Sequence, residues 1–359
     1  MNITYPIDFT QWSTYQSCPM LWWETYVNGW RKKPADYQRD DALCIGSLYH
    51  DGMENFLRTG KPFIKQEVLD ECTPKPEALE MVVSMLEEYQ LWAGLEDWQL
   101  ITIEKPLEFN IQLADDAFVP CMAKLDASVL VTKPIRIETG QVGQTEELEI
   151  GYYTYEHKTK AATSNRAAFL RRWELDAQPL FQQRALETYI KANPDLPQLP
   201  VRGTIINVAE KPSIYIPVRT CKGCKTKQDM SSYEIVNGHY VCRLCGFTNE
   251  FAPAIKTSAR QPTTFYRIKL PAHGWNNPVT NIILESIAST HANMMAMRAA
   301  TFPEEAIANP YNGFAKCIHP MWGPCDFVDI HTSQSTHEAT LTLHQIDTTK
   351  YMKDNSVGT

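Results

Sequence analysis

The stretch "GYYTYEHKTKAA", residues 151–162, is the part of the sequence that most constrains the fold. Tyrosines and a threonine fill its first half, which predicts a buried β-strand. The strand then runs into an acid and a base two positions apart, Glu156 and Lys158, with His157 between them. Side chains two apart on a strand point to the same side, so Glu156 and Lys158 share one face and His157 lies on the other.

A second predicted strand, "VPCMAKLDASVLV" at 119–131, places Asp126 among apolar residues. Burying an acid is costly unless it has a partner. If the two strands pair, Asp126 and Glu156 converge and can hold a hard cation such as Mg²⁺ or Mn²⁺ through oxygen, with Lys158 beside them. Such a site suits phosphodiester hydrolysis, because the metal polarises the phosphate and the lysine orients water or balances charge. The alternative is a surface Glu–Lys pair at the end of a strand.

Composition and charge narrow the class of protein. The chain has 359 residues, 43% of them hydrophobic, and a formal net charge of −8. This charge argues against a protein that coats nucleic acid through a broad basic face. The N-terminus shows no signal peptide, and no apolar run reaches the roughly 18 residues of a spanning helix. We therefore expect a soluble, cytoplasmic protein without membrane contact, located in the host cell if a phage encodes it.

The order of predicted elements points to an α/β fold. Helical patterns precede a run of strands, and helices and strands then alternate. The predicted helices are 8–30, 41–58, 75–93, 169–192 and 278–300, and the predicted strands are 98–113, 119–131, 151–158, 201–211 and 263–270, with a hairpin at 135–150. This order predicts a central mixed β-sheet flanked by helices.

Four cysteines form the most specific local pattern in the chain. Two C-x-x-C pairs, "CKGC" and "CRLC", are separated by 17 residues and comprise Cys221, Cys224, Cys242 and Cys245. This spacing is typical of a zinc ribbon, in which four thiolates hold a structural Zn²⁺ and leave no position open for catalysis. The alternative is four unrelated thiols. We expect a small zinc-ribbon insertion at 219–250.

Five short motifs in a fixed order carry a resemblance to a known family. They are "STYQSCPMLWW" at 13–23, "GSLYH" at 46–50, "KLDA" at 124–127, "YEHKT" at 155–159 and "DAQPLFQQ" at 176–183. Together they resemble the PD-(D/E)XK nuclease superfamily, and in particular its RecB-like branch of CRISPR-associated RecB-like and AddB-type exonucleases. The resemblance implies a restriction-endonuclease-like core. The nuclease domain is then discontinuous, 1–218 and 251–335, around the zinc ribbon and before a tail at 336–359.

The resemblance also implies roles for individual residues. His50, Asp126 and Glu156 would hold Mg²⁺ or Mn²⁺, and the backbone carbonyl of His157 would add a ligand. Lys158 would position the attacking water, and Gln178 would orient the lysine or the phosphate. The tyrosine of the family's Q-x-x-x-Y motif is replaced here by Gln182. The implied activity is that of a DNA exonuclease working in recombination, repair or processing of phage or mobile-element DNA, with recombination or replication proteins as partners.

Two further sets of residues have competing interpretations. RecB-like relatives with a 4Fe–4S cluster use four cysteines, and this chain offers Cys18, Cys317 and Cys325, which is one thiolate short. These cysteines either hold a cluster with another ligand or remain as packing residues. Arg166, Arg171 and Arg172 follow the core strand and either contact the DNA backbone or form an ordinary solvated helix face.

Two rival functions remain open at the level of sequence. The nuclease fold can persist without activity, with the zinc ribbon recruiting nucleic acid or a protein partner. The intact set of His50, Asp126, Glu156 and Lys158 argues against this alternative. The enzyme can also act on RNA or on another phosphodiester, which only a substrate assay separates.

Overall fold

The computed structural model describes 15 stretches of the chain: 6–32, 42–93, 97–112, 118–139, 144–161, 165–174, 176–212, 218–229, 232–236, 239–249, 263–272, 278–300, 318–319, 323–324 and 343–345.

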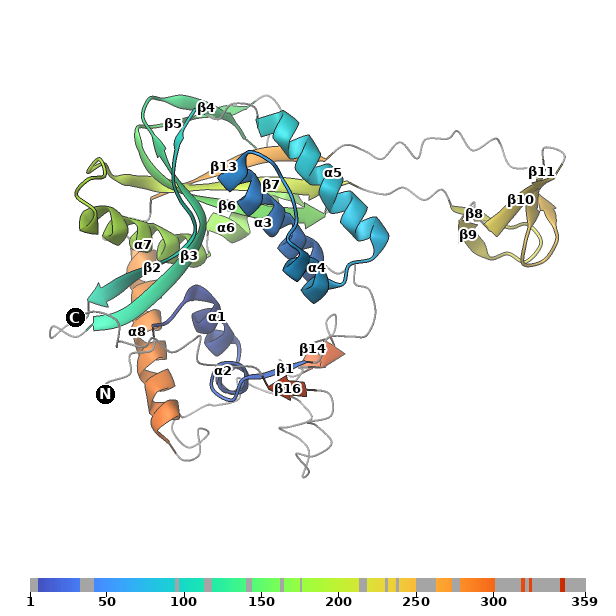
Figure 1. Ribbon diagram of the computed structural model, residues 1–359. Coiled ribbons are helices and arrows are strands. Elements are labelled where there is room, and N and C mark those ends of the chain that lie inside the picture. Colours follow the sequence, from blue (N-terminus) through green and yellow to red (C-terminus); the bar gives the residue numbers. More distant parts are fainter. Residues whose placement is uncertain are drawn as a thin grey trace.

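A five-stranded mixed sheet forms the centre of the molecule (Figure 1). Its order is β13-β7-β6-β3-β2, with bounds Thr264–Pro271, Val201–Lys211, Gly151–Ala161, Phe118–Val131 and Gln99–Gln112. Only β6 and β7 run parallel, and the other neighbours are antiparallel. The predicted mixed sheet is therefore confirmed, and the stretch 151–161 forms its central strand.

Helices cover both faces of this sheet. On one face, Trp173 of α6 (Arg166–Glu174) packs on Ile206 and Val208 of β7, and α7 (Gln178–Ala192) lies beside it. On the other face, α3 (Ala42–Thr59) and α5 (Pro76–Ala93) bury their apolar sides against Ala209, with the short α4 (Gln66–Cys72) between them. Alternate side chains of β6 and β7 therefore point to different helix layers.

A third group of helices closes the end of the sheet formed by β2 and β3. These helices are α1 (Phe9–Ser17), α2 (Pro19–Tyr26) and α8 (Pro278–Ala299). Ile287 and Met297 of α8 share one hydrophobic core with Trp22, and Gln16 donates to Thr290 Oγ1 at 2.6 Å. Helices α1 and α2 therefore pack against α8 although they are distant from it in sequence.

Two expectations about helices are corrected by the structure. The single helix predicted at 169–192 is two helices, because Gln178 and Pro179 start a new helix. Proline lacks an N–H and is tolerated only in a first helical turn, where Asp176 also accepts from the Gln178 N–H at 2.9 Å. The helix predicted at 8–30 is likewise divided, at Cys18, whose extended backbone separates α1 from α2.

The remaining elements are small. The predicted hairpin is present as β4 (Ile135–Glu138) and β5 (Thr145–Leu148), which pair antiparallel. Two isolated pairs join β1 (Trp30–Lys32) to β16 (Leu343–Gln345) and β14 (Ile318–His319) to β15 (Gly323–Pro324). The cysteine-rich insert contains β8 (Val218–Thr220), β9 (Lys227–Asp229), β10 (Tyr233–Val236), β11 (His239–Cys242) and β12 (Thr248–Asn249). No helix in the described stretches has the length and apolarity needed to span a membrane.

Candidate active site

The candidate site lies where strands β3 and β6 separate. Their pairing runs from Val131 opposite Gly151 to Ala127 opposite Tyr155 and does not continue to the next residues, Asp126 and Glu156. Here the backbone N–H of His157 donates to Asp126 Oδ2 at 2.8 Å. A buried N–H needs an acceptor, and the side chain of Asp126 supplies it in place of a strand backbone. Asp126 is thus fixed beside the E-x-K segment, as the sequence predicted.

His50 reaches the same carboxylate from helix α3. Its Nδ1 lies 3.3 Å from Asp126 Oδ2, and its side chain is 30% exposed. Burial alone would raise the pKa of Asp126, but the nearby imidazole outweighs it and holds this pKa well below its usual range. Burial likewise opposes the charged form of His50, and the Asp126 carboxylate reverses that effect and raises the His50 pKa. The two side chains therefore attract each other as an ion pair.

Glu104 is a third member of this cluster that the sequence interpretation missed. The register places it opposite Asp126, because Ile103 pairs with Ala127 and Lys105 with Leu125. Ligand atoms of His50, Glu104 and Asp126 all lie within 4.8 Å of one another. One imidazole and two carboxylates form a donor set that suits a divalent cation such as Mn²⁺ or Mg²⁺. A strand register is the signal that would have revealed Glu104, and one sequence does not provide it.

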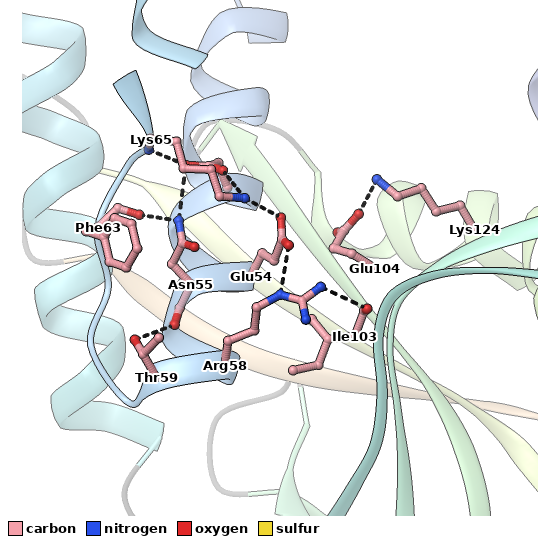
Figure 2. A network of polar contacts seen from close by, with 10 residues as sticks. Glu54, Asn55, Arg58, Thr59, Phe63, Lys65, Ile103, Glu104 and Lys124 are labelled. Carbon is pink, nitrogen blue, oxygen red and sulfur yellow. Dashed lines mark hydrogen bonds and ion pairs between the residues drawn. The ribbon is translucent and has the colours of Figure 1, made fainter. Parts of the chain in front are cut away.

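The backbone of Glu104 is unusual. Its φ is +48°, in the left-handed region that non-glycine residues rarely adopt. Its carboxylate forms an ion pair with Lys124 on the neighbouring strand, which Figure 2 shows. Burial is the main factor that raises the pKa of Glu104, with Lys124 opposing it and Asp126 adding to it. Strain at a clustered acid is characteristic of functional sites.

A polar network ties helix α3 to strand β2 next to Glu104 (Figure 2). Glu54 accepts from Arg58 Nε at 2.9 Å and from Lys65 Nζ at 3.1 Å. Arg58 also donates to the backbone carbonyl of Ile103 at 3.2 Å. His50, Glu54 and Arg58 recur every four residues and so lie along one side of α3. The network therefore holds the helix that carries His50 against the strand that carries Glu104.

Glu156 is held by two side chains of helix α7. Its Oε1 accepts from Gln178 Nε2 at 2.9 Å and also contacts Lys158 Nζ. Its Oε2 accepts from Gln182 Nε2 at 2.6 Å. Burial, followed by the charge of Asp126, raises the pKa of Glu156. Glu156 lies beside the group formed by His50, Glu104 and Asp126, and its role as a metal ligand stays a prediction. Gln182 directly contacts Glu156 although it replaces the family's tyrosine.

Lys158 shares a face with Glu156, as the strand periodicity predicted. Its ammonium also lies 5.0 Å from the centre of the Trp173 ring. Burial would lower the pKa of Lys158, but Glu156 and Asp126 reverse this and raise it. The lysine is thus protonated at neutral pH and held between a carboxylate and an aromatic face.

The side chain of His157 points toward helices α3 and α5, where its ring contacts those of His50 and Tyr89. Its side chain is fully buried, with the ring perpendicular to that of His50 at 6.3 Å. Its Nδ1 lies 3.4 Å from Asn207 Nδ2, and burial lowers its pKa to about 3. The imidazole is therefore neutral and packs behind the site. The ligand role of its backbone carbonyl stays a prediction.

The arginines singled out from the sequence differ in their surroundings. Arg166 makes two hydrogen bonds of 2.7 Å to the Glu210 carboxylate, and its guanidinium lies 5.0 Å from the Tyr266 ring centre. Arg171 and Arg172 are exposed in the last turn of α6. The structure thus gives Arg166 a partner within the protein, and a DNA contact for any of the three stays a prediction.

Comparison with known families agrees with this geometry. The sequence model of the PD-(D/E)XK nuclease superfamily matches residues 7–212, more than half of the chain. The chain belongs to the PD-(D/E)XK nuclease superfamily. The matched region contains His50, Glu104, Asp126, Glu156 and Lys158 and ends before the cysteine-rich insert. A search of curated proteins gave no significant match.

The cysteine-rich insert of this PD-(D/E)XK protein brings its four cysteines together. The sulfur atoms of Cys221, Cys224, Cys242 and Cys245 all lie within 4.8 Å of one another. Each C-x-x-C pair forms the same turn, because the N–H groups of Lys225 and Gly246 donate to the carbonyls of Cys221 and Cys242 at 3.0 and 2.7 Å. Four converging thiols on two matched turns fit a tetrahedral Zn²⁺.

Of the three cysteines considered for an iron–sulfur cluster, the structure describes Cys18. Cys18 is buried at the junction of α1 and α2. Cys317 and Cys325 lie outside the described residues. The cluster therefore stays one of two open interpretations of these cysteines.

Proposed function

We propose that this PD-(D/E)XK protein is a metal-dependent DNA exonuclease that hydrolyses phosphodiester bonds. One observation carries the proposal, namely that His50, Asp126 and the Glu156–Lys158 pair meet where β3 and β6 separate. An acid pair, an imidazole and a protonated lysine at one point are the groups that phosphodiester hydrolysis requires.

His50, Glu104 and Asp126 would hold Mg²⁺ or Mn²⁺, and Glu156 and the His157 carbonyl are the proposed additional ligands. When bound, the ion supplies Lewis-acid polarisation of the phosphate and activation of water. The protein itself supplies orientation, because helix α3 carries His50 and the neighbouring strands β2, β3 and β6 carry the other donors.

Lys158 supplies the fixed positive charge of the site. Because Glu156 and Trp173 hold its ammonium, it can balance charge that develops on the phosphate and orient the attacking water. Gln178 and Gln182 fix the Glu156 carboxylate and through it the position of Lys158. We propose these two glutamines as positioning residues.

The RecB-like assignment and the exonuclease activity are the finer parts of the proposal. They are supported by a histidine on an upstream helix that contacts Asp126, and by a glutamine at the start of the downstream helix that contacts Glu156. A discontinuous nuclease domain, 1–218 and 251–335, interrupted by a zinc ribbon at 219–250 and followed by a tail at 336–359, is the proposed domain organisation. Recombination, repair or phage DNA processing, with protein partners from those pathways, is the proposed setting.

The test is degradation of end-labelled linear DNA, single- and double-stranded, in Mg²⁺ or Mn²⁺. A closed circle and an RNA of the same sequence are run alongside. Lys158→Met removes the charge but keeps most of the side-chain volume, and we expect it to lower the rate by about 10²-fold or more. Lys191→Met, at an exposed position of α7, is the matched control and should leave the rate unchanged.

Four outcomes are informative. Shortening of linear DNA with the circle spared supports the exonuclease, and cutting of the circle identifies an endonuclease instead. Degradation of RNA alone would support the rival substrate. If wild type cuts nothing with either metal, or Lys158→Met cuts as fast as wild type, the proposed active site is wrong.

A further inference from the structure

The cysteine-rich insert differs in charge from the rest of the chain. Residues 218–249 contain five lysines and arginines and two acids, whereas the whole chain has a formal net charge of −8. The insert also exposes three large apolar side chains, Leu244 at 73%, Phe247 at 44% and Val236 at 43%. The insert is thus basic and exposes apolar side chains, whereas the chain as a whole is acidic. Such a surface is typical of a site that binds a partner rather than of a purely structural element.

Three of the cations and two of the apolar side chains lie on the two adjoining cysteine turns. The two cysteine turns touch each other, since Cys221 and Cys245 sulfurs lie 3.6 Å apart and a Cβ added to Gly223 would lie 2.5 Å from Phe247 Cβ. Lys222, Lys225, Arg243, Leu244 and Phe247 are all exposed residues of these two turns. We call this set the knuckle face. The absence of a side chain at Gly223 is what lets the aromatic ring sit beside the first turn.

One member of the knuckle face occupies a strained position. The two turns are equivalent, and the residue after the last cysteine of each has a positive φ, +69° at Gly246 and +59° at Lys225. Glycine adopts this conformation freely, whereas lysine does not. The first turn therefore accepts strain and presents a cation where the second turn uses glycine. Strain retained at an exposed charged residue is a sign of a binding role.

We propose that the knuckle face binds single-stranded DNA. Cations supply phosphate contacts, and the exposed Phe247 and Leu244 supply surfaces on which unstacked bases can lie. Reading of a duplex groove commonly uses a helix or a paired ribbon laid in the groove, whereas the residues of the knuckle face lie on the two cysteine turns and outside the paired strands of the insert. The choice of DNA as the nucleic acid rests on the proposed function, and the inference gives that enzyme a second contact with its substrate.

The test measures binding and does not depend on cleavage. The full-length, Zn²⁺-loaded protein, without Mg²⁺ or Mn²⁺, is titrated into a fluorescently labelled 20-nucleotide poly(dT), and the anisotropy is followed at several salt concentrations. Phe247→Ala should weaken binding about tenfold, the scale of one lost base-stacking contact. The combined change Lys222→Ala, Lys225→Gly and Arg243→Ala should reduce the salt slope by about two.

The variants are chosen so that folding does not obscure the result. Lys225→Gly fits the positive φ of its turn as Gly246 does, and zinc content is measured for every variant. Lys191→Ala, an exposed lysine of α7, is the matched control and should bind like wild type. Lys225→Gly alone, with zinc retained, should weaken binding a few-fold because one phosphate contact is lost.

The outcomes separate this inference from the proposed nuclease. Weakened poly(dT) binding by zinc-loaded knuckle variants supports the inference even if no cleavage is ever observed. If wild type cleaves DNA but the knuckle variants bind poly(dT) as wild type does, the inference is overturned and the nuclease stands. Equal loss for a duplex of the same length would identify a general DNA contact and overturn the single-strand assignment. Failure of wild type to bind poly(dT) would leave a protein partner as the occupant of the knuckle face.

Discussion

The side-chain amide of Gln182 donates to Glu156 Oε2 at 2.6 Å, and both side chains are buried. Together with Gln178 and Lys158, it occupies both oxygens of a carboxylate that burial would otherwise drive toward its neutral form. A residue that departs from the family's Q-x-x-x-Y motif thus directly contacts the carboxylate of Glu156.

Gln182→Leu should raise the pKa of Glu156 further, because the charged form loses a hydrogen bond. We expect the acidic limb of the pH–rate profile to move to higher pH. The free energy of unfolding should fall by about 1.5–3 kcal/mol, the usual worth of a hydrogen bond to a charged group. The control is Gln183→Leu on the same helix, which is equally buried but donates to the neutral Thr204 hydroxyl at 3.0 Å. It should destabilise the protein without moving the limb, and a shift in both variants would contradict this account.

Glu104→Gly should weaken metal binding while leaving the free energy of unfolding nearly unchanged. Glycine tolerates the +48° φ of this position, so relief of strain offsets the loss of the ion pair and of strand rigidity. We expect the metal-free protein to unfold within about 1 kcal/mol of wild type. Its affinity for Mn²⁺ should fall by at least about tenfold, since even changes around a ligand have effects of that size. Calorimetric titration and thermal unfolding measure the two quantities.

Thr73→Gly is the matched control for Glu104→Gly. Thr73 ends helix α4 with φ +41° and belongs to no metal-ligating group among the described residues. Thr73→Gly should relieve the backbone strain of this positive φ and leave the affinity for Mn²⁺ unchanged. Unchanged affinity in Glu104→Gly as well would remove Glu104 from the proposed ligands.

The cysteine-rich insert should hold one Zn²⁺ and depend on it for folding. Within the described residues its core contains only Cys221, Tyr233 and Cys242, with Cys224 and Tyr240 packed against it, which is too small to fold without a metal. Cys242→Ser should lose the ion in elemental analysis and become sensitive to proteolysis within 218–249. Cys72→Ala, at a buried cysteine of α4, should keep it. Full zinc content in Cys242→Ser would argue against the four-cysteine site.

Glu210→Gln tests the ion pairs behind the active-site strand. Glu210 accepts from Lys160 at 2.6 Å and from Arg166 at 2.7 Å, and its side chain is 6% exposed. Burial opposes its ionisation, but the two cations outweigh it and lower the Glu210 pKa below 4.5. Near neutral pH the variant should lose about 3–5 kcal/mol, because Lys160 stays buried without a counter-charge.

The pH dependence of this difference has a definite sign. A depressed carboxyl pKa stabilises the folded state above the unfolded pKa, and this stability is lost as pH falls through the folded pKa. The gap between wild type and Glu210→Gln should therefore narrow below about pH 4.5 in urea unfolding experiments. Glu149→Gln, at a 61% exposed ion pair, should change stability by about 0.5 kcal/mol or less at any pH. A gap that widens on acidification would exclude this explanation.

The sequence alone determined that residues 151–161 form a strand and which of its residues lie on each of its faces. Alternation along "GYYTYEHKTK" fixed Glu156 and Lys158 on one side and His157 on the other, since the strand repeat is two residues whatever the strand packs against. The spacing of Cys221, Cys224, Cys242 and Cys245 likewise predicted their convergence, because short-range turns decide it.

The tertiary structure decided which residues from distant parts of the chain join that strand. The pairing register of β2 with β3 placed Glu104 opposite Asp126, and the start of a new helix at Gln178 brought Gln182 to Glu156. Both depend on contacts between segments far apart in sequence, whose alignment is set by packing of the whole sheet and its helices. Local periodicity carries no information about that alignment. The same sequence pattern is compatible with a pairing register shifted by one residue, and that register would bring a different residue to the site.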